Sequence, residues 1–276
     1  MIVRELDDER SLLIRQEDHA ELSGLFAAHW GNDFFSRLDP YDSMVCAGTF
    51  HDSHFRDVEA ALPIDMSAGR PHSHRTTPFW QRHFDALQEN IEWLDRRDRY
   101  AALLVSMHHS GLPQNRYGII NSWQNGGVAS QRRREPRPGV AAMIQKMETE
   151  QRGWIRELEE RDSLAEKKVW FNFRLLEVLD LLSLYFCCDG FGENGFRETQ
   201  LDPVPTDFGT ERNVTMRFVP VDGSTLRLDP YPFDRSPLEI SVIGRIVRRR
   251  PGATEAEIHA EFWRSPRQSL SWNVTD

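Results

Sequence analysis

Residues 175–188 read LLEVLDLLSLYFCC, and this stretch decides most of what the sequence predicts about the fold. A helix that is apolar on all sides is buried in a protein core. Asp180 lies inside the stretch, with Leu179 before it and Leu181 after it. A buried carboxylate without a partner is costly, so something positive must face it. We therefore expect a buried helix over about residues 165–188, with a counter-charge beside Asp180.

Other polar residues extend along the same side of this helix. Glu177 lies three residues before Asp180 and Ser183 lies three residues after it, so the three side chains share a helix face. A metal ion, an arginine or a cluster of hydrogen-bond donors would each satisfy this polar stripe. Taken alone, the stripe fits a structural arginine, but the placement of the histidines favours a metal ion.

Histidine is concentrated in the first half of the chain, where nine of the ten histidines lie between His19 and His109. Apolar residues recur at helical spacing over residues 16–30, which places His19 in the first turn of a predicted helix. Whatever role histidine has in this protein, the sequence assigns it to this half.

Two further helices are expected to carry paired ligand candidates. The dipeptide His51-Asp52 falls in the middle of a helix that should begin near residues 42–43 and end at Pro63. His108 and His109 lie near the end of an apolar helix over residues 99–111. Imidazole nitrogens mixed with carboxylate oxygens suit Fe, Mn, Co, Ni or Zn, so one or two divalent ions are the expected cofactors.

The remainder of the chain predicts strands at both ends. Residues 2–5 and 11–15 flank a polar turn and predict a hairpin, and a second hairpin is expected around Asp222-Gly223. The expected fold class is mainly α. It is a single domain with a helical bundle core over residues 16–190. A small peripheral antiparallel sheet is formed by residues 1–15 and 210–276.

Composition limits the classes of function. The 276 residues have a formal net charge of −9, which argues against a protein that coats nucleic acid. No stretch approaches the roughly 18 apolar residues of a membrane helix, and no signal-peptide pattern opens the chain. Three cysteines do not form a disulfide framework, so a cytoplasmic protein is expected. The oligomeric state stays open, and a homo-oligomer is one of the alternatives.

The order of these candidates resembles the HD superfamily of metal-dependent phosphohydrolases, whose pattern is a His, a His-Asp pair, often further histidines and a late Asp on a buried helix. The resemblance implies that the helical core over residues 16–190 is HD-like, and it implies a first metal site formed by His19, His51, Asp52 and Asp180. It also implies a second site, to which Asp52 and either His108 or His109 contribute. One departure is Ser53-His54, which stands where those enzymes have a lysine or an acid.

Most of the chain also resembles, more narrowly, a bacterial family catalogued as a domain of unknown function. The similar segments are MIVRE at the start, QEDHAELSG, LLVSMHHSGL, LLEVLDLLSLYFCC and PLEISVIGR. This resemblance implies membership of a family and no particular reaction.

Two groups of residues are candidates for roles other than metal binding. Asp52 and His54 are the expected catalytic residues, because either could manage a proton beside the metal. The loop segment GRPHSHR could hold an anionic substrate, and its candidate substrate-binding residues are Arg70, His72, His74 and Arg75. The alternative for this segment is an exposed polar loop. The long loop over residues 111–139 is either a lid or binding loop, or a solvated connection.

The leading functional hypothesis is metal-assisted hydrolysis of a small anionic substrate of the phosphohydrolase type. A bound divalent ion lowers the pKa of a coordinated water and polarises a phosphoryl or other ester oxygen. The first alternative is an HD-type diiron oxygenase, since some members of that superfamily hold two irons with the same set of ligands. The second alternative is a binding scaffold without catalytic activity.

Overall fold

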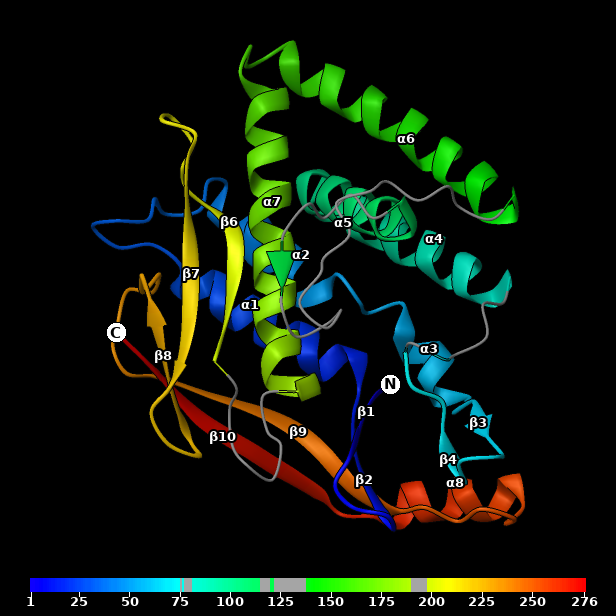
Figure 1. The fold of residues 1–276 in the computed structure, drawn as a ribbon. Helices are drawn as coiled ribbons and strands as arrows, with labels where there is room; N and C mark the ends of the chain where they lie inside the picture. The colour runs from blue at the N-terminus through cyan, green and yellow to red at the C-terminus, as the bar shows by residue number, and fades with distance from the viewer. Residues whose placement is uncertain (75, 77–80, 115–119, 122–137, 190–197) are drawn as a thin grey trace.

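The computed structural model describes residues 1–276 apart from 75, 77–80, 115–119, 122–137 and 190–197. Helices account for 49% of it and strands for 24%. A curled sheet wraps one side of a helical layer, with α1 and α7 nearest the sheet (Figure 1). None of the described helices has the length and the apolar character needed to cross a bilayer.

Within the described residues, eight strands form the main sheet in the order β1-β2-β9-β10-β8-β7-β6-β5. The neighbours β8 and β10 run parallel, and the other neighbouring strands are antiparallel. The bounds are β1 Ile2–Glu5, β2 Arg10–Ile14, β5 Ile120–Asn121, β6 Thr199–Asp207, β7 Arg212–Pro220, β8 Thr225–Asp229, β9 Leu238–Arg248 and β10 Arg267–Thr275. A separate two-stranded sheet pairs β3 (Ile64–Asp65) with β4 (Arg70–Pro71).

The helices pack mainly on one face of this sheet. Their bounds are α1 Gln16–His29, α2 Tyr41–Phe50, α3 Phe55–Ala60, α4 Gln81–Asp95, α5 Arg99–Gly111, α6 Pro138–Glu159, α7 Ala165–Leu184 and α8 Glu255–Arg264. A π-helical turn, Tyr185–Asp189, continues α7. As the apolar sequence predicts, α7 is buried almost completely from Asn172 onward.

The hydrophobic core joins α7 to the sheet rather than lying inside a helical bundle. Phe186, in the π-helical turn that continues α7, is fully buried. Its ring centroid lies 6.0 Å from that of Phe26 of α1 and 5.5 Å from that of Trp272 of β10. One cluster of buried apolar side chains includes residues of α1, α5, α7 and seven strands of the main sheet. The position of Asp180 is therefore fixed by packing against both layers.

The predicted fold class, a mainly α bundle with a small peripheral sheet, is wrong. Both predicted hairpins are present as β1–β2 and β7–β8, but β9 and β10 join them into a single large sheet. The C-terminal part of the sheet was predicted to begin at residue 210. It begins earlier, with β6, a strand that was not predicted. Pro203 and Pro205 argue against a strand in the sequence, because proline is rare inside sheets. In the structure they lie where the β6–β7 register shifts, a position that tolerates proline.

The helix predicted to run through His51-Asp52 is also interrupted. α2 ends at Phe50 and α3 begins at Phe55, so residues 51–54 form a turn between the two helices. The dipeptide is therefore not in the middle of a helix. A turn frees these side chains from the 100° spacing of a helix. His51, Asp52 and His54 can consequently all reach inward.

Candidate metal centre

Small residues bring the first two helices into close contact. A Cβ atom added to Gly24 on α1 would collide with Thr49, and one added to Gly48 on α2 would lie 3.1 Å from the carbonyl oxygen of Ser23. Only residues without a side chain allow this approach. As a result, His19 of α1 and His51, which follows α2, lie with their ring centroids 5.0 Å apart.

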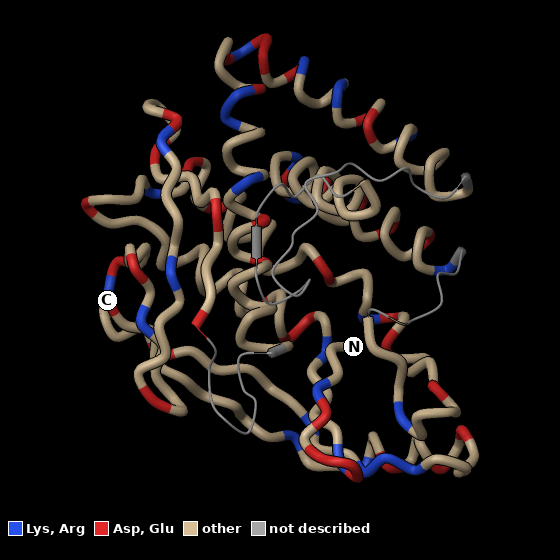
Figure 2. Tube along the Cα trace, viewed as in Figure 1, with Lys and Arg blue, Asp and Glu red and all other residues tan. Residues whose placement is uncertain are grey.

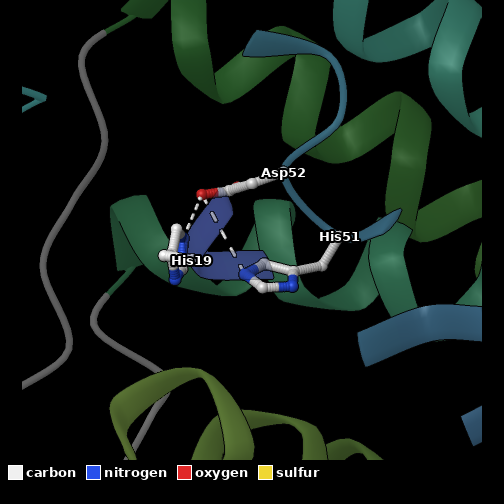
Figure 3. Close-up of side chains that lie close together, drawn as sticks. All are labelled: His19, His51 and Asp52. Atoms are coloured by element: carbon white, nitrogen blue, oxygen red, sulfur yellow. Dashed lines mark hydrogen bonds and ion pairs between the residues drawn. The ribbon is translucent and has the colours of Figure 1, made fainter. Parts of the chain in front are cut away.

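The His51-Asp52 pair and Asp180 meet at this crossing. His19 Nε2 lies 3.0 Å from Asp52 Oδ2, and His51 Nε2 lies 4.0 Å from the same oxygen (Figure 3). From α7, Asp180 Oδ1 lies 3.4 Å from His51 Nε2 and 3.9 Å from His19 Nδ1. Residues that are 161 positions apart along the chain thus share one small polar volume.

The neighbouring histidines of α5 point to two sides of this volume, because adjacent helical residues diverge by about 100°. The His108 ring lies 5.1 Å from the His51 ring, and the His109 ring lies 4.6 Å from the His54 ring. His109 Nε2 is also 3.6 Å from Asp52 Oδ1. His108 therefore joins the His51 side, and His109 joins the Asp52–His54 side.

Among the described residues, three buried groups have ligand atoms within 4.8 Å of one another. They are His19–His51–Asp52, His51–His108–Asp180 and Asp52–His54–His109. The first two share His51, and the first and third share Asp52. We call these seven residues the seven-residue cluster. Its overlapping groups could hold one ion, or two ions on either side of Asp52.

His51 and His109 each use one ring nitrogen to donate a hydrogen bond to a carbonyl, and the other nitrogen of each ring is available for a metal ion. His51 Nδ1 donates to the carbonyl of Gly48 at 2.8 Å, so in the neutral ring Nε2 carries the lone pair and faces Asp180. His109 Nε2 donates to the carbonyl of His51 at 2.7 Å, which leaves Nδ1 as the acceptor. Such bonds to the opposite nitrogen set the tautomer and orientation of metal-binding histidines.

A serine plays the same part for His19. Ser183 Oγ lies 2.8 Å from His19 Nδ1 and donates to the carbonyl of Asp180 at 2.8 Å. Ser23 Oγ donates to Ser183 Oγ at 2.9 Å. Since the Ser183 proton is used toward Asp180, its oxygen accepts from His19 Nδ1. This arrangement presents the lone pair of His19 Nε2 to the cluster.

We predict that Ser183→Ala weakens metal binding about 10–100-fold, the usual effect of removing an outer partner of a metal ligand. Isothermal titration of the metal-free protein with Mn²⁺ or Zn²⁺ measures this change. The matched control is Ser106→Ala, another buried serine, which accepts from Gln151 at 2.9 Å outside the cluster. Equal affinities for the two variants would show that Ser183 does not orient His19.

The protonation states of the cluster suit a cation. Burial, and then the charge of His109, lowers the pKa of His54 well below its usual range and that of His108 to about 3. Burial alone would raise the pKa of Asp52, but His51 and His19 hold it well below its usual value. His54 and His108 are thus neutral imidazoles near an ionised carboxylate.

His51 differs from His54 and His108, because its pKa is raised rather than lowered. Burial alone would lower its pKa, but Asp52 and Asp180 raise it to about 9. Within the described residues, His51 Nε2 and His54 Nδ1 are buried and have no hydrogen-bond partner. Buried polar atoms are rarely left in this way. Five imidazoles, two carboxylates and these unpartnered nitrogens fit a divalent metal ion.

All six ligand candidates from the sequence lie in this cluster: His19, His51, Asp52, His108, His109 and Asp180. The structure adds His54, for which the sequence suggested a catalytic role, in the group with Asp52 and His109. Sequence reasoning missed Gln16, whose Nε2 donates to Asp52 Oδ2 at 3.0 Å. Its position three residues before His19, on the same helix face, was the available signal.

The described contacts of the candidate substrate-binding residues join them to residues outside the seven-residue cluster. Arg70 pairs with Glu5, with its Nε 2.8 Å and its second terminal nitrogen 2.7 Å from Glu5 Oε1, so its charge is already neutralised. His72 Nδ1 lies 3.3 Å from the hydroxyl of Thr76, and the backbone N–H of His74 donates to the carbonyl of Met1. Arg75 and most of the 111–139 loop, with Arg132, Arg133 and Arg134, lie outside the described residues.

Residues 1–249 match a family described as a protein of unknown function (DUF3891). This is consistent with the likeness of the sequence to a domain of unknown function. No curated protein matches the chain, and no solved structure matches it. The comparisons therefore leave the reaction to be argued from the seven-residue cluster.

Proposed function

Because the chain belongs to the DUF3891 family, whose function is unknown, we propose from the metal centre itself that the protein is a metal-dependent hydrolase of a small anionic substrate. The observation that carries this proposal is the convergence of five histidines and two aspartates, all buried, in the seven-residue cluster. Such mixed nitrogen and oxygen ligands are typical of hydrolytic sites for Zn, Mn, Fe, Co or Ni.

We assign two ion positions to the cluster. The first position is served by His19, His51 and Asp180, with His108 lying against His51. The second position is served by His54 and His109. Asp52 serves both, because its Oδ2 faces His19 and its Oδ1 faces His109. Two divalent ions outweigh the charge of the two carboxylates, so a fully loaded centre is net positive. This charge favours a substrate that carries phosphate or another anionic group.

The chemistry that a divalent ion supplies in such a site is activation of water and polarisation of a phosphoryl or other ester oxygen. The protein holds the ligands in place through Gln16, Ser183 and the Gly48 carbonyl, so little reorganisation is needed. With only the first position filled, the neutral His54 offers its Nδ1 lone pair as a proton acceptor beside Asp52.

We predict that His54→Ala retains about one ion per chain but lowers kcat by about 10²–10⁴-fold, the range for losing a proton-transfer group. Metal content and turnover are measured on the same preparation. The matched control is His29→Ala, a histidine that pairs with Asp234 at 2.9 Å away from the cluster. Wild-type turnover in His54→Ala would contradict its role.

A screen of phosphate monoesters, phosphodiesters and nucleotides tests the hydrolase proposal directly. We expect turnover that requires added metal and disappears in His51→Ala. A protein that binds stoichiometric metal and yet hydrolyses none of these substrates would count against the hydrolase while leaving the metal centre intact.

The abundance of imidazole favours a second candidate, a diiron oxygenase, because five histidines with two carboxylates also suit a pair of iron ions. Metal identity separates the two candidates. Two irons per chain, with an absorption spectrum that changes on exposure to oxygen, would favour the oxygenase. Zinc or manganese with ester hydrolysis would favour the hydrolase.

A further inference from the structure

A second polar cleft lies beside α8, along β9 and β10, and contains none of the seven-residue cluster. Its free volume is about 380 Å³ with its open mouth included. Three arginines line it, Arg15, Arg245 and Arg267, together with the exposed ring of Trp263. Figure 2 shows blue segments in this lower part of the molecule, with red segments close by.

Two of these arginines are placed directly opposite each other. In the β9–β10 register, Arg245 pairs with Arg267. Like charges in such cross-strand pairs destabilise a sheet. In the part of the chain that the structure describes, no carboxylate lies within ion-pair distance of either one, whereas Arg15 pairs with Glu17 at 2.8 Å. The Arg245–Arg267 pair therefore carries positive charge that no ion pair among the described residues neutralises.

Arg245 is held rigidly in this position. Its guanidinium donates to the carbonyl of Ser265 and lies 5.3 Å from the ring centre of Phe262 and 5.9 Å from that of Trp263. Burial, followed by the charges of Arg267 and Arg15, lowers the pKa of Arg245. A fixed guanidinium, partly removed from water beside a like charge, is a favourable environment for an anion.

One acidic residue also lines the cleft. Burial raises the pKa of Asp18 to about 6, and the nearby Arg15 opposes this rise. Asp18 makes no ion pair with Arg245 or Arg267 within the described residues, although its charge opposes the lowering of the Arg245 pKa. Glu17 and Glu59 pair with Arg15, so Arg245 and Arg267 supply the positive charge of the cleft.

We propose that this cleft binds a phosphate-type oxyanion between the guanidinium groups of Arg245 and Arg267, with Trp263 as an aromatic wall. Planar guanidinium groups match the oxygens of such an anion through paired hydrogen bonds. The bound anion would also relieve the repulsion across the β9–β10 pair. This proposal is independent of the proposed hydrolase activity.

Isothermal titration with inorganic phosphate tests the cleft. The protein is His51→Ala, treated with a chelator, so that the metal centre cannot take up the anion. We expect one phosphate per chain, and about tenfold or greater weakening when Arg267→Gln is added. The matched control is Arg248→Gln, an exposed arginine of β9 that does not line the cleft, which should retain the affinity.

Thermal unfolding gives a second test of phosphate binding between Arg245 and Arg267. Without phosphate, Arg267→Gln should raise the Tm by about 1 °C or more, because it removes the like-charge pair. Phosphate should raise the Tm of the parent and not that of the variant. The absence of phosphate binding, or equal affinity with and without Arg267, would overturn the proposal.

The same titration with adenosine monophosphate distinguishes free phosphate from phosphate on a larger carrier. Tighter binding than inorganic phosphate, lost in Trp263→Ala, would identify a phosphorylated aromatic ligand for the cleft. Equal affinity for the two would identify the free anion as sufficient. Both results uphold an oxyanion site, provided that Arg267→Gln weakens each of them.

Discussion

Asp52→Ala should remove metal from both positions of the cluster and lower metal affinity by more than about 100-fold, beyond the usual cost of losing an outer partner. The reason is geometric. Asp52 Oδ2 lies 3.0 Å from His19 Nε2, and its Oδ1 lies 3.6 Å from His109 Nε2, so one carboxylate faces both groups of ligands. Metal analysis of the purified variant and its residual turnover should both approach zero.

Two further variants separate metal loss from misfolding. Asp52→Asn keeps an acceptor for Gln16 but removes the charge, so it should fold like the wild type and still lose most of the metal. The surface variant Asp234→Ala, which removes the partner of His29, should keep full metal content. Wild-type metal content in Asp52→Asn would be evidence against a shared ligand.

Removing the metal should lower the Tm of the wild-type protein by about 8–16 °C. A ligand present at about 1,000 times its Kd stabilises the folded state by about 4 kcal/mol, and each kcal/mol corresponds to about 2–4 °C in a domain of comparable size. Loss of the ion also leaves the carboxylates of Asp52 and Asp180 buried beside the imidazoles of His19 and His51.

Differential scanning calorimetry with and without a chelator measures this shift. The Asp52→Asn variant should show almost none, because it has no tightly bound metal to lose. Identical melting temperatures of the wild type with and without chelator would mean that the cluster contributes nothing to stability through metal. An equal shift in both proteins would place the stabilising ion elsewhere.

The sequence was sufficient to find the cluster because its strongest signal is local. An aspartate in an apolar helix needs a partner wherever the helix lies, and Asp180 does lie buried beside His51. The division of His108 and His109 between two groups could not be predicted. It depends on the rotation of α5 against the turn at residues 51–54, and this rotation is set by tertiary packing.

The sheet was predicted less well, because its pairings are distant in the sequence. β10 runs parallel to β8 and antiparallel to β9, and β9 pairs in turn with β2 near the start of the chain. Periodicity identifies a strand but does not determine its neighbour. In β6, Pro203 and Pro205 also removed the local signal, since proline cannot donate to the ladder. The small antiparallel sheet that was predicted already joined residues 1–15 to residues 210–276, while its large, curled form and the parallel β8–β10 pair were not predicted.

An anomalous diffraction experiment at the absorption edges of Mn, Fe, Co, Ni and Zn, on crystals of the protein as purified, tests the central claim most directly. The account predicts one or two strong peaks within coordination distance of Asp52, one on the side of His19, His51 and Asp180 and the other on the side of His54 and His109. Crystals that diffract well and show no anomalous peak at this position, or show one only at another site, would contradict it.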